Sequence, residues 1–380
     1  MTNLTPKFID YSGSQFSGKH THGDHSLDLW EPMVMTKEAI DEEIDRLASM
    51  PKPNNGVRRS RFVHPRSVNE KAHSWAPGVD VSLDVLLPGE RTKAVRQNSS
   101  VVNFCIKGGG SVVQNGKTTG YNQYDLVTTP AMWVHEYVND TKEIQVRLRY
   151  SNGALLERLN IHYVDEAPPP HGSGEDDLTV TAEEEGEWHH SKFGAFQIGD
   201  EGAWLMPYEG LVNPPPAKII SKHWPWAKVQ AELDRYAEGL GQDYEGRRLY
   251  LLYDPVTGRS NGTTANFFAT ITHRPAGISD RPHRHASAAM NYYFAGEGHS
   301  VVQGVEYPWK AGDFMFSAPG WAIHAHTADK GPVYELTIQD MPFCINTDCL
   351  LWQEDMKGPI SLLGSHAGFL TNRDKLAKAS

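Results

Sequence analysis

The chain has 380 residues, of which 39% are hydrophobic and 22% are charged, and its formal net charge is -11 at pH 7. This length is enough for two domains with cores of their own, and the composition is typical of a soluble globular protein. The acidic balance argues against nucleic acids and anionic membranes as partners, because both bind basic surfaces.

The sequence carries no signal for export, membrane insertion or a disulfide framework. None of its apolar runs reaches the length of a transmembrane helix, and its beginning lacks the hydrophobic segment of a secretory signal. Its 3 cysteines include no CxxC pair. We therefore expect a cytoplasmic protein with reduced cysteines.

The N-terminal part is predicted to be polar except for one helix. Residues 35–50 are predicted to form this helix, because aliphatic side chains recur on one face and Thr36 is a suitable N-cap. Three histidines precede it at a spacing that resembles a metal site, but in a Gly- and Ser-rich leader we interpret them as solvated. They are His20, His22 and His25.

From about Ala76 the pattern changes to short runs rich in β-branched residues, separated by Gly, Pro and Asn-Gly. Such runs predict an antiparallel barrel or a double-sheet jelly roll, here ending near Val164. An acidic stretch rich in Pro and Gly follows, then a helix beginning near His223 and a second β region. The predicted segments are an N-terminal helical arm (1–75), a first barrel (76–165), an acidic linker with a helix (166–244), a second barrel (245–355) and a tail (356–380).

The two β regions resemble each other, which indicates an internal repeat. Residues 112–135 match residues 301–324 in length and in the positions of their turn residues. The alignment pairs Val95 with His283, Gln97 with His285, and His135 with His324. One imidazole cannot replace three, so the first barrel is predicted to keep its fold without binding a metal.

The strongest candidate site is formed by three histidines of the second β region. His283 and His285 are two residues apart and therefore lie on the same face of a strand. His324 follows about forty residues later and can meet them from another strand of a closed barrel. Three neutral imidazoles on one side of a metal leave the other side open, which is the arrangement of a working site rather than a structural one.

The same alternation identifies candidate pocket residues. If His283 and His285 point inward, Asn291 and Tyr293 do so too, and His326 shares the face of His324.

These motifs resemble the cupin superfamily, and specifically two-cupin proteins similar to gentisate 1,2-dioxygenase and its salicylate and hydroxynaphthoate relatives. The resemblance covers residues 60–355 and implies an all-β fold. The implied fold consists of two cupin barrels of the double-stranded β-helix, jelly-roll type, with a helical N-terminal segment and a helical linker element. The residues that carry it are Gly277, His283, His285 and Gly296 in one motif, and Gly312, Asp313, Pro319 and His324 in the other.

The resemblance implies an Fe(II)-dependent dioxygenase that opens the ring of a hydroxylated or amino-substituted aromatic acid with O2. Mn(II) and Ni(II) are the alternative metals for this donor set. The resemblance also implies a small aromatic substrate and a homo-oligomer, either a dimer or a tetramer. His326 matches a histidine that contacts substrate and transfers protons in the family, and Asp340 matches an aspartate expected to orient a histidine.

The sequence departs from the family pattern in two respects. The family's metal triad lies in the N-terminal barrel, whereas here it lies in the C-terminal one. The arginine that binds the substrate carboxylate is replaced by Asn291. Arg281 is our first candidate for that function and Arg274 the second.

Two other classes of function remain open from the sequence. One is a cupin isomerase, lyase or hydrolase that uses the metal as a Lewis acid and works without oxygen. The other is a non-catalytic binding protein in which both barrels serve as scaffold.

Overall fold

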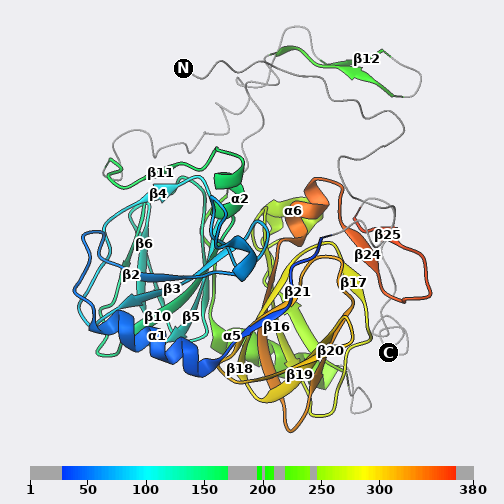
Figure 1. Cartoon of the computed structure of the whole chain (residues 1–380). Helices are drawn as coiled ribbons and strands as arrows, with labels where there is room; N and C mark the ends of the chain where they lie inside the picture. The colour runs from blue at the N-terminus through cyan, green and yellow to red at the C-terminus, as the bar shows by residue number, and fades with distance from the viewer. Residues whose placement is uncertain (1–27, 170–194, 199–201, 209–218, 240–245, 365–380) are drawn as a thin grey trace. The chain divides into compact units, whose positions relative to one another are not determined.

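The computed structural model describes residues 28–169, 195–198, 202–208, 219–239 and 246–364 (Figure 1). The three leader histidines, most of the acidic linker and most of the predicted tail lie outside these residues. The chain divides into two compact units. The first comprises Glu38–Gly239 and Tyr250–Ala269, and the second comprises Met1–Lys37, Leu240–Leu249 and Thr270–Ser380. The segment boundaries drawn from the sequence stay predictions.

The described residues are mostly β structure in antiparallel sheets, as the alternating runs of the sequence predict. The first unit is built on a six-stranded sheet, a three-stranded sheet and a pair of short strands. The six-stranded sheet has the order β14 (His223–Trp224), β8 (Leu126–Thr129), β5 (Val101–Lys107), β10 (Gln145–Ser151), β3 (Asp80–Leu86) and β2 (Arg58–Phe62). The others are β7 (Lys117–Tyr121), β6 (Gly110–Gln114) and β9 (His135–Val138), and the pair β4 (Arg96–Gln97) and β11 (Val164–Asp165).

The second unit repeats this arrangement. Its six-stranded sheet has the order β1 (Met33–Met35), β21 (Phe314–Ala318), β18 (Ala289–Ala295), β23 (Val333–Gln339), β16 (Phe268–Arg274) and β15 (Arg248–Leu251). Two three-stranded sheets complete it: β20 (Val305–Lys310), β19 (Glu297–Val302) and β22 (His324–Ala328), and β17 (Arg284–His285), β24 (Leu351–Gln353) and β25 (Ser361–Leu362). The order β8-β5-β10-β3 in one unit corresponds to β21-β18-β23-β16 in the other, so the repeat predicted from sequence is present in the strand order.

Helices and turns occupy the remaining described segments. Helix α1 (Lys37–Ser49) buries Ile40, Ile44 and Leu47 on one face, which confirms the predicted helix. The helix predicted from His223 is α5 (Trp226–Gly239). The other elements are α2 (Gly153–Arg158), α6 (Met341–Asn346), the 3-10 turns Pro65–Ser67 and Pro255–Ser260, and the hairpin of β12 (Phe196–Gln197) and β13 (Trp204–Leu205). No described helix is both long and apolar enough to span a membrane.

One turn shows why the repeat keeps its glycines. Gly108 and Gly296 occupy the same place in the two units, with φ angles of 69° and 81°. A Cβ atom would lie 2.3 Å from the carbonyl oxygen of Ile144 at the first position and 2.5 Å from that of Pro332 at the second. Only glycine allows both the positive φ and this close approach of two backbones.

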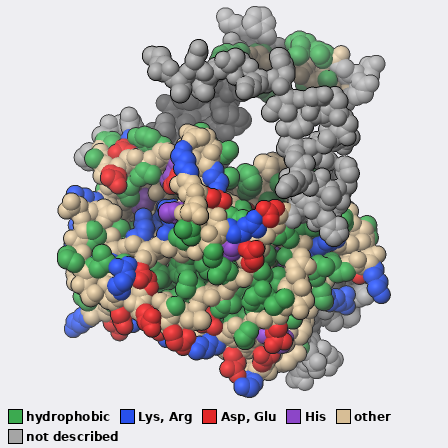
Figure 2. Space-filling view, viewed as in Figure 1, with side chains coloured by type: hydrophobic (Ala, Val, Ile, Leu, Met, Phe, Trp, Pro, Cys, Tyr) green, Lys and Arg blue, Asp and Glu red, His purple; other side chains and the backbone are tan. Residues whose placement is uncertain are grey.

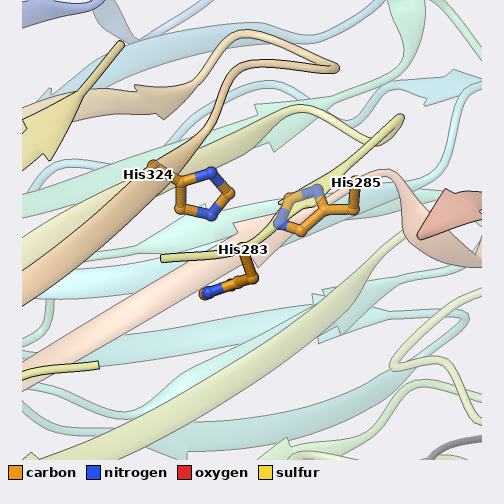
Figure 3. Close-up of side chains that lie close together, drawn as sticks. All are labelled: His283, His285 and His324. Carbon is orange, nitrogen blue, oxygen red and sulfur yellow. The ribbon is translucent and has the colours of Figure 1, made fainter. Parts of the chain in front are cut away.

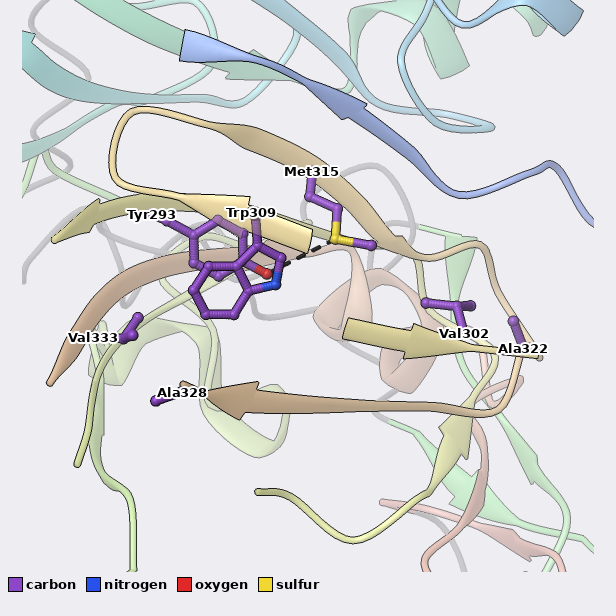
Figure 4. Packing of buried hydrophobic residues seen from close by; sticks show 7 residues of the cluster. All are labelled: Tyr293, Val302, Trp309, Met315, Ala322, Ala328 and Val333. Atoms are coloured by element: carbon purple, nitrogen blue, oxygen red, sulfur yellow. Dashed lines mark hydrogen bonds between the residues drawn. The ribbon is translucent and has the colours of Figure 1, made fainter. Parts of the chain in front are cut away.

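The core of the second unit contains an aromatic stack between two strands (Figure 4). The rings of Tyr293 and Trp309 are 3.7 Å apart between centroids and nearly parallel, at 5°. Met315 and Val302 pack in the same cluster, and all four side chains are buried. Such a stack contributes about 1 kcal/mol beyond the burial of its area, and it packs a side chain of β18 against one of β20.

Candidate metal centre

Three histidines converge in the second unit, as Figure 3 shows. His285 lies on β17, His324 begins β22, and backbone hydrogen bonds in both directions pair His283 with His324. One ligand atom from each residue lies within 4.8 Å of the others. The three histidines that the sequence predicts to meet therefore lie together. Among the residues that the structure describes, they are also the one cluster of three or more His, Cys, Asp or Glu side chains that could hold a metal.

A backbone carbonyl fixes the orientation of each imidazole ring. In every case Nδ1 lies within hydrogen-bond distance of a carbonyl oxygen two residues away. The contacts are His283 to Arg281 at 2.8 Å, His285 to Ser287 at 2.9 Å and His324 to Ala322 at 2.9 Å. A carbonyl can only accept, so Nδ1 carries the proton and Nε2 keeps its lone pair. All three rings can therefore offer Nε2 to the same metal ion.

Burial keeps two of the rings neutral. Burial, and next the neighbouring His324, lowers the pKa of His285 well below its ordinary value. Burial, and next His283, lowers the pKa of His324 to about 3. Neutral imidazole is the form that binds a metal, and removing a positive charge from this site makes it more favourable for a divalent cation. The donor set fits a divalent transition metal with open positions on the side that no ligand covers.

The ligand rings are supported by contacts that sequence reasoning missed. The indole of Trp352 stacks on both His283 and His285, with centroids 5.7 Å and 5.3 Å away. Trp352 occupies this position because β24 pairs with β17 in a register that sets it opposite His285. Ser287 Oγ lies 3.0 Å from His285 Nδ1 and donates to Gln339 Oε1. Such partners hold the ring orientation that a metal requires.

His326 lies beside the triad, as the strand alternation predicts. Its ring centroid is 5.6 Å from that of His324. Its Nδ1 is 2.7 Å from Ser300 Oγ, and that oxygen also accepts from Trp309 Nε1 at 2.9 Å. Ser300 thus ties His326 to the aromatic stack of the core. Burial, and next the nearby His324, lowers the pKa of His326 well below its ordinary value, so the ring is neutral at pH 7.

The candidate substrate residues are placed very differently from one another. Arg274 is fully buried, paired with Asp280 at 2.9 Å and Glu335 at 3.0 Å. It also donates to the carbonyl of His326. Arg281 is exposed, and its carbonyl is the acceptor for His283.

The two uncharged candidates on β18 are both buried. Asn291 donates to Thr337 Oγ1 at 2.9 Å and accepts from Ser317. Tyr293 lies in the core stack with Trp309, and its hydroxyl is 3.4 Å from Ser300 Oγ. Asn291 is thus held by neighbouring strands, and Tyr293 connects to the triad through Ser300 and His326.

Asp340 does not hydrogen-bond a histidine. Its carboxylate accepts from the backbone N–H of Ala288 at 2.8 Å, which ties the start of β18 to the start of α6. Burial raises the pKa of Asp340 to about 6. The folded state therefore disfavours the ionised carboxylate, and stability is lost as the pH rises through that value.

The Asp340→Asn variant is accordingly expected to be more stable than the wild type at pH 8 and nearly equal to it at about pH 3.5, below the ordinary pKa of an aspartate. The amide oxygen can still accept from Ala288, but it does not ionise. A shift of this size corresponds to a gain of about 3 kcal/mol in the free energy of unfolding at pH 8. Urea unfolding at the two pH values measures it. A difference that did not change with pH would contradict the prediction.

The first unit retains the frame of this site with different side chains. Val95 pairs with His135 through two backbone hydrogen bonds, as His283 pairs with His324. Gln97 lies opposite Val164 in the position where His285 faces Trp352. One imidazole, that of His135, thus stands where the second unit has three.

Similar proteins can be compared with this fold and site. No family model matches the chain. The 1-hydroxy-2-naphthoate 1,2-dioxygenase of Nocardioides sp. (strain KP7) is 25% identical over 323 residues, 83% of this chain and 76% of that protein. The gentisate 1,2-dioxygenase of Haloferax sp. is 26% identical over 339 residues, 87% of each chain.

A solved structure has a similar fold. The salicylate 1,2-dioxygenase of Pseudoaminobacter salicylatoxidans, in its adducts with gentisate, superposes with a TM-score of 0.65 at 17% identity, covering 86% of each chain.

Proposed function

Because this chain is a distant homologue, over most of its length, of the gentisate, salicylate and 1-hydroxy-2-naphthoate 1,2-dioxygenases, we propose that it is a ring-cleaving dioxygenase of the same type. Its substrate is a hydroxylated aromatic acid, and this class includes acids whose ring carries an amino group or another substituent. Its active site is the histidine triad of the second unit. The observation that carries the proposal is this cluster of three imidazoles whose Nε2 lone pairs are free to share one metal.

The proposed architecture is two cupin barrels, the first without a metal. The matching strand orders and the paired positions of Val95 and His283 support it. The cytoplasmic location and the dimer or tetramer expected from the sequence stay predictions.

The proposed metal is Fe(II), with Mn(II) and Ni(II) as alternatives. When bound, it supplies open coordination positions and a route for electron density from an electron-rich ring to dioxygen. In the overall reaction a ring carbon–carbon bond breaks and both oxygen atoms of O2 enter the ring-opened acid, so no other reductant is needed. The three histidines hold the metal, and Trp352 fixes two of their rings.

The neighbouring residues position substrate and protons in this proposal. His326, held by Ser300 beside the triad, is the candidate that accepts a proton from a substrate hydroxyl and returns it to the product, the role that the family resemblance implies. Arg281 is the candidate for the substrate carboxylate, because its side chain is exposed and it lies two residues before His283 in the sequence. Arg274 already holds two carboxylates and the backbone of β22, so we assign it a positioning role.

The test is oxygen uptake by anaerobically reconstituted protein. A panel of gentisate, salicylate, 5-substituted salicylates, hydroxyanthranilates, hydroxynaphthoate and hydroquinone would be offered with each metal. Uptake on one member with Fe(II), and both label atoms of 18O2 in its product, is the expected result. Turnover of a substrate under nitrogen would instead indicate the Lewis-acid alternative. Binding of metal without turnover of any substrate would favour a binding protein.

The His326→Gln variant is expected to keep its metal and to lower kcat by about 10²- to 10⁴-fold, the usual contribution of a positioned acid or base. Glutamine retains polar atoms that can reach Ser300 but cannot take up a proton. The measurement is kcat and KM across pH, together with metal content. Unchanged kcat with a raised KM would contradict the proton-transfer role and leave His326 a binding residue.

A further inference from the structure

The first unit contains a cavity of about 540 Å³ in the position that corresponds to the metal centre of the second. Val95, Gln97 and His135, the counterparts of the three metal ligands, all line it. Figure 2 shows histidine side chains next to Lys and Arg side chains on the surface of the molecule. The unit has thus kept the concave site while changing its lining.

The lining of the cavity carries one more positive than negative side chain. The cations are Arg59, Arg61, Lys93, Arg147 and Arg149, and the anions are Asp80, Asp84, Glu157 and Glu166. Arg147 and Arg149 are buried, and Arg59 joins them at the cavity. Asp84 forms two bonds of 2.6 Å with Arg59 and lies 3.5 Å from Arg147. Asp80 supplies the second carboxylate. Two buried guanidinium groups, those of Arg147 and Arg149, and the 40% exposed one of Arg59 thus share the lining with the buried carboxylates of Asp80 and Asp84.

Arg149 has fewer described hydrogen bonds than Arg59 or Arg147. Its one described hydrogen bond goes to Asp80 at 3.4 Å, near the limit for such a bond, although the side chain is only 9% exposed. A guanidinium has five N–H donors. Burial, and next the repulsion from Arg59, lowers the pKa of Arg149 to about 10, so the group stays charged at pH 7. An anion in the cavity would supply both the missing charge and the missing acceptors.

The side chain of Gln97 is a second, uncharged indication that the cavity binds a ligand. Its side chain is buried, lines the cavity, and has no hydrogen-bond partner for its Nε2 atom. A buried donor without a partner is costly in a folded protein and is expected to be satisfied by a molecule that enters the site.

We propose that the first unit binds a small organic monocarboxylate without a metal, with the carboxylate held by Arg149 and the amide of Gln97. One excess positive charge matches a monoanion. The apolar part of the ligand would lie against Val95 and the ring of Tyr137, which also line the cavity. The volume suits an acid with a single ring. This site is separate from the triad and does not depend on the proposed dioxygenase activity.

The experiment is isothermal titration of the full-length chain with benzoate, which lacks the adjacent hydroxyl that chelation of a metal would use. It is run in the wild type and in the His285→Ala variant, which disables the metal centre. One equivalent bound with equal affinity in both proteins is the expected result. Arg149→Met and Gln97→Leu, each made in the His285→Ala background, are expected to weaken binding at least tenfold.

Several controls make the result decisive. Arg91→Met removes an exposed arginine of the same unit, paired with Glu136, and should leave binding unchanged. Gln97→Leu disturbs no described ion pair, so it tests the site even if Arg149→Met fails to fold. Loss of benzoate binding in His285→Ala alone would assign it to the triad and overturn the proposal. Binding of inorganic phosphate but not benzoate, dependent on Arg149, would also overturn it, as would no binding of either anion.

Discussion

Replacing His285 with alanine is expected to remove the bound metal and to lower oxygen uptake more than about 100-fold. Removing a group that merely supports a metal ligand already reduces affinity or activity about 10- to 100-fold, and loss of the ligand itself is more severe. His285 is only 1% exposed, and Ser287 and Trp352 hold its ring in place, so water cannot easily take its position. Metal content and an oxygen electrode measure the two effects.

His299→Ala is the matched control for this experiment. His299 lies on β19 of the same unit and bonds Asp329 near the surface, away from the three ligand rings. Its replacement should leave metal content and uptake unchanged. If His285→Ala kept a full equivalent of metal, the triad would not be the metal site.

The second large effect is expected from Arg274→Met, which should lower the free energy of unfolding by about 3–5 kcal/mol. Arg274 is fully buried and neutralises two carboxylates that are themselves buried, those of Asp280 and Glu335. Methionine has a similar volume but leaves these charges with fewer partners in a region of low polarity. Urea unfolding followed by tryptophan fluorescence measures the change.

The pH dependence of this loss has a definite sign. Burial acts to raise the pKa of Asp280, but Arg247 and Arg274 hold it well below the usual value. A carboxyl whose pKa is lowered by folding stabilises the protein above its unfolded pKa, and the stabilisation disappears as the pH falls. The loss of stability in Arg274→Met should therefore be largest near neutral pH and should shrink only as the pH falls below about 4, the ordinary pKa of an aspartate.

Arg281→Met provides the comparison for stability. Arg281 lies seven positions from Arg274 in the sequence but is exposed, so its replacement should change the free energy of unfolding by less than about 0.5 kcal/mol. If Arg281→Met and Arg274→Met lowered the free energy of unfolding equally, the buried ion pairs of Arg274 would not be the source of the stability. The same variant tests the substrate role of Arg281, since a raised KM without a change in stability is the result which that role predicts.

Much of the fold and the triad could be predicted from the sequence because the signals are local or repeated. The helix over residues 37–49 follows from the spacing of three aliphatic residues, and β-branched runs between glycines mark the strands. The spacing of His283 and His285 places them on one face, whatever their surroundings. Comparison of the two β regions then shows which positions correspond to His283 and His285 in the first.

Only the tertiary structure distinguished residues that look alike in the sequence. Arg274 and Arg281 are both arginines near the triad, yet one is buried between two carboxylates and the other faces solvent. Tyr293 shares the alternation of the triad strand but packs on Trp309, and Asp340 bonds a backbone N–H rather than a histidine.

The sequence by itself determined the kind of fold, the repeat and the three histidines of the candidate metal site, because periodicity and spacing are properties of one segment at a time. The support from Trp352, the buried ion pairs and the charged cavity of the first unit were decided by the tertiary structure. Each of these depends on which distant strands become neighbours and on how far water is excluded between them. Neither quantity can be read from the order of residues along the chain.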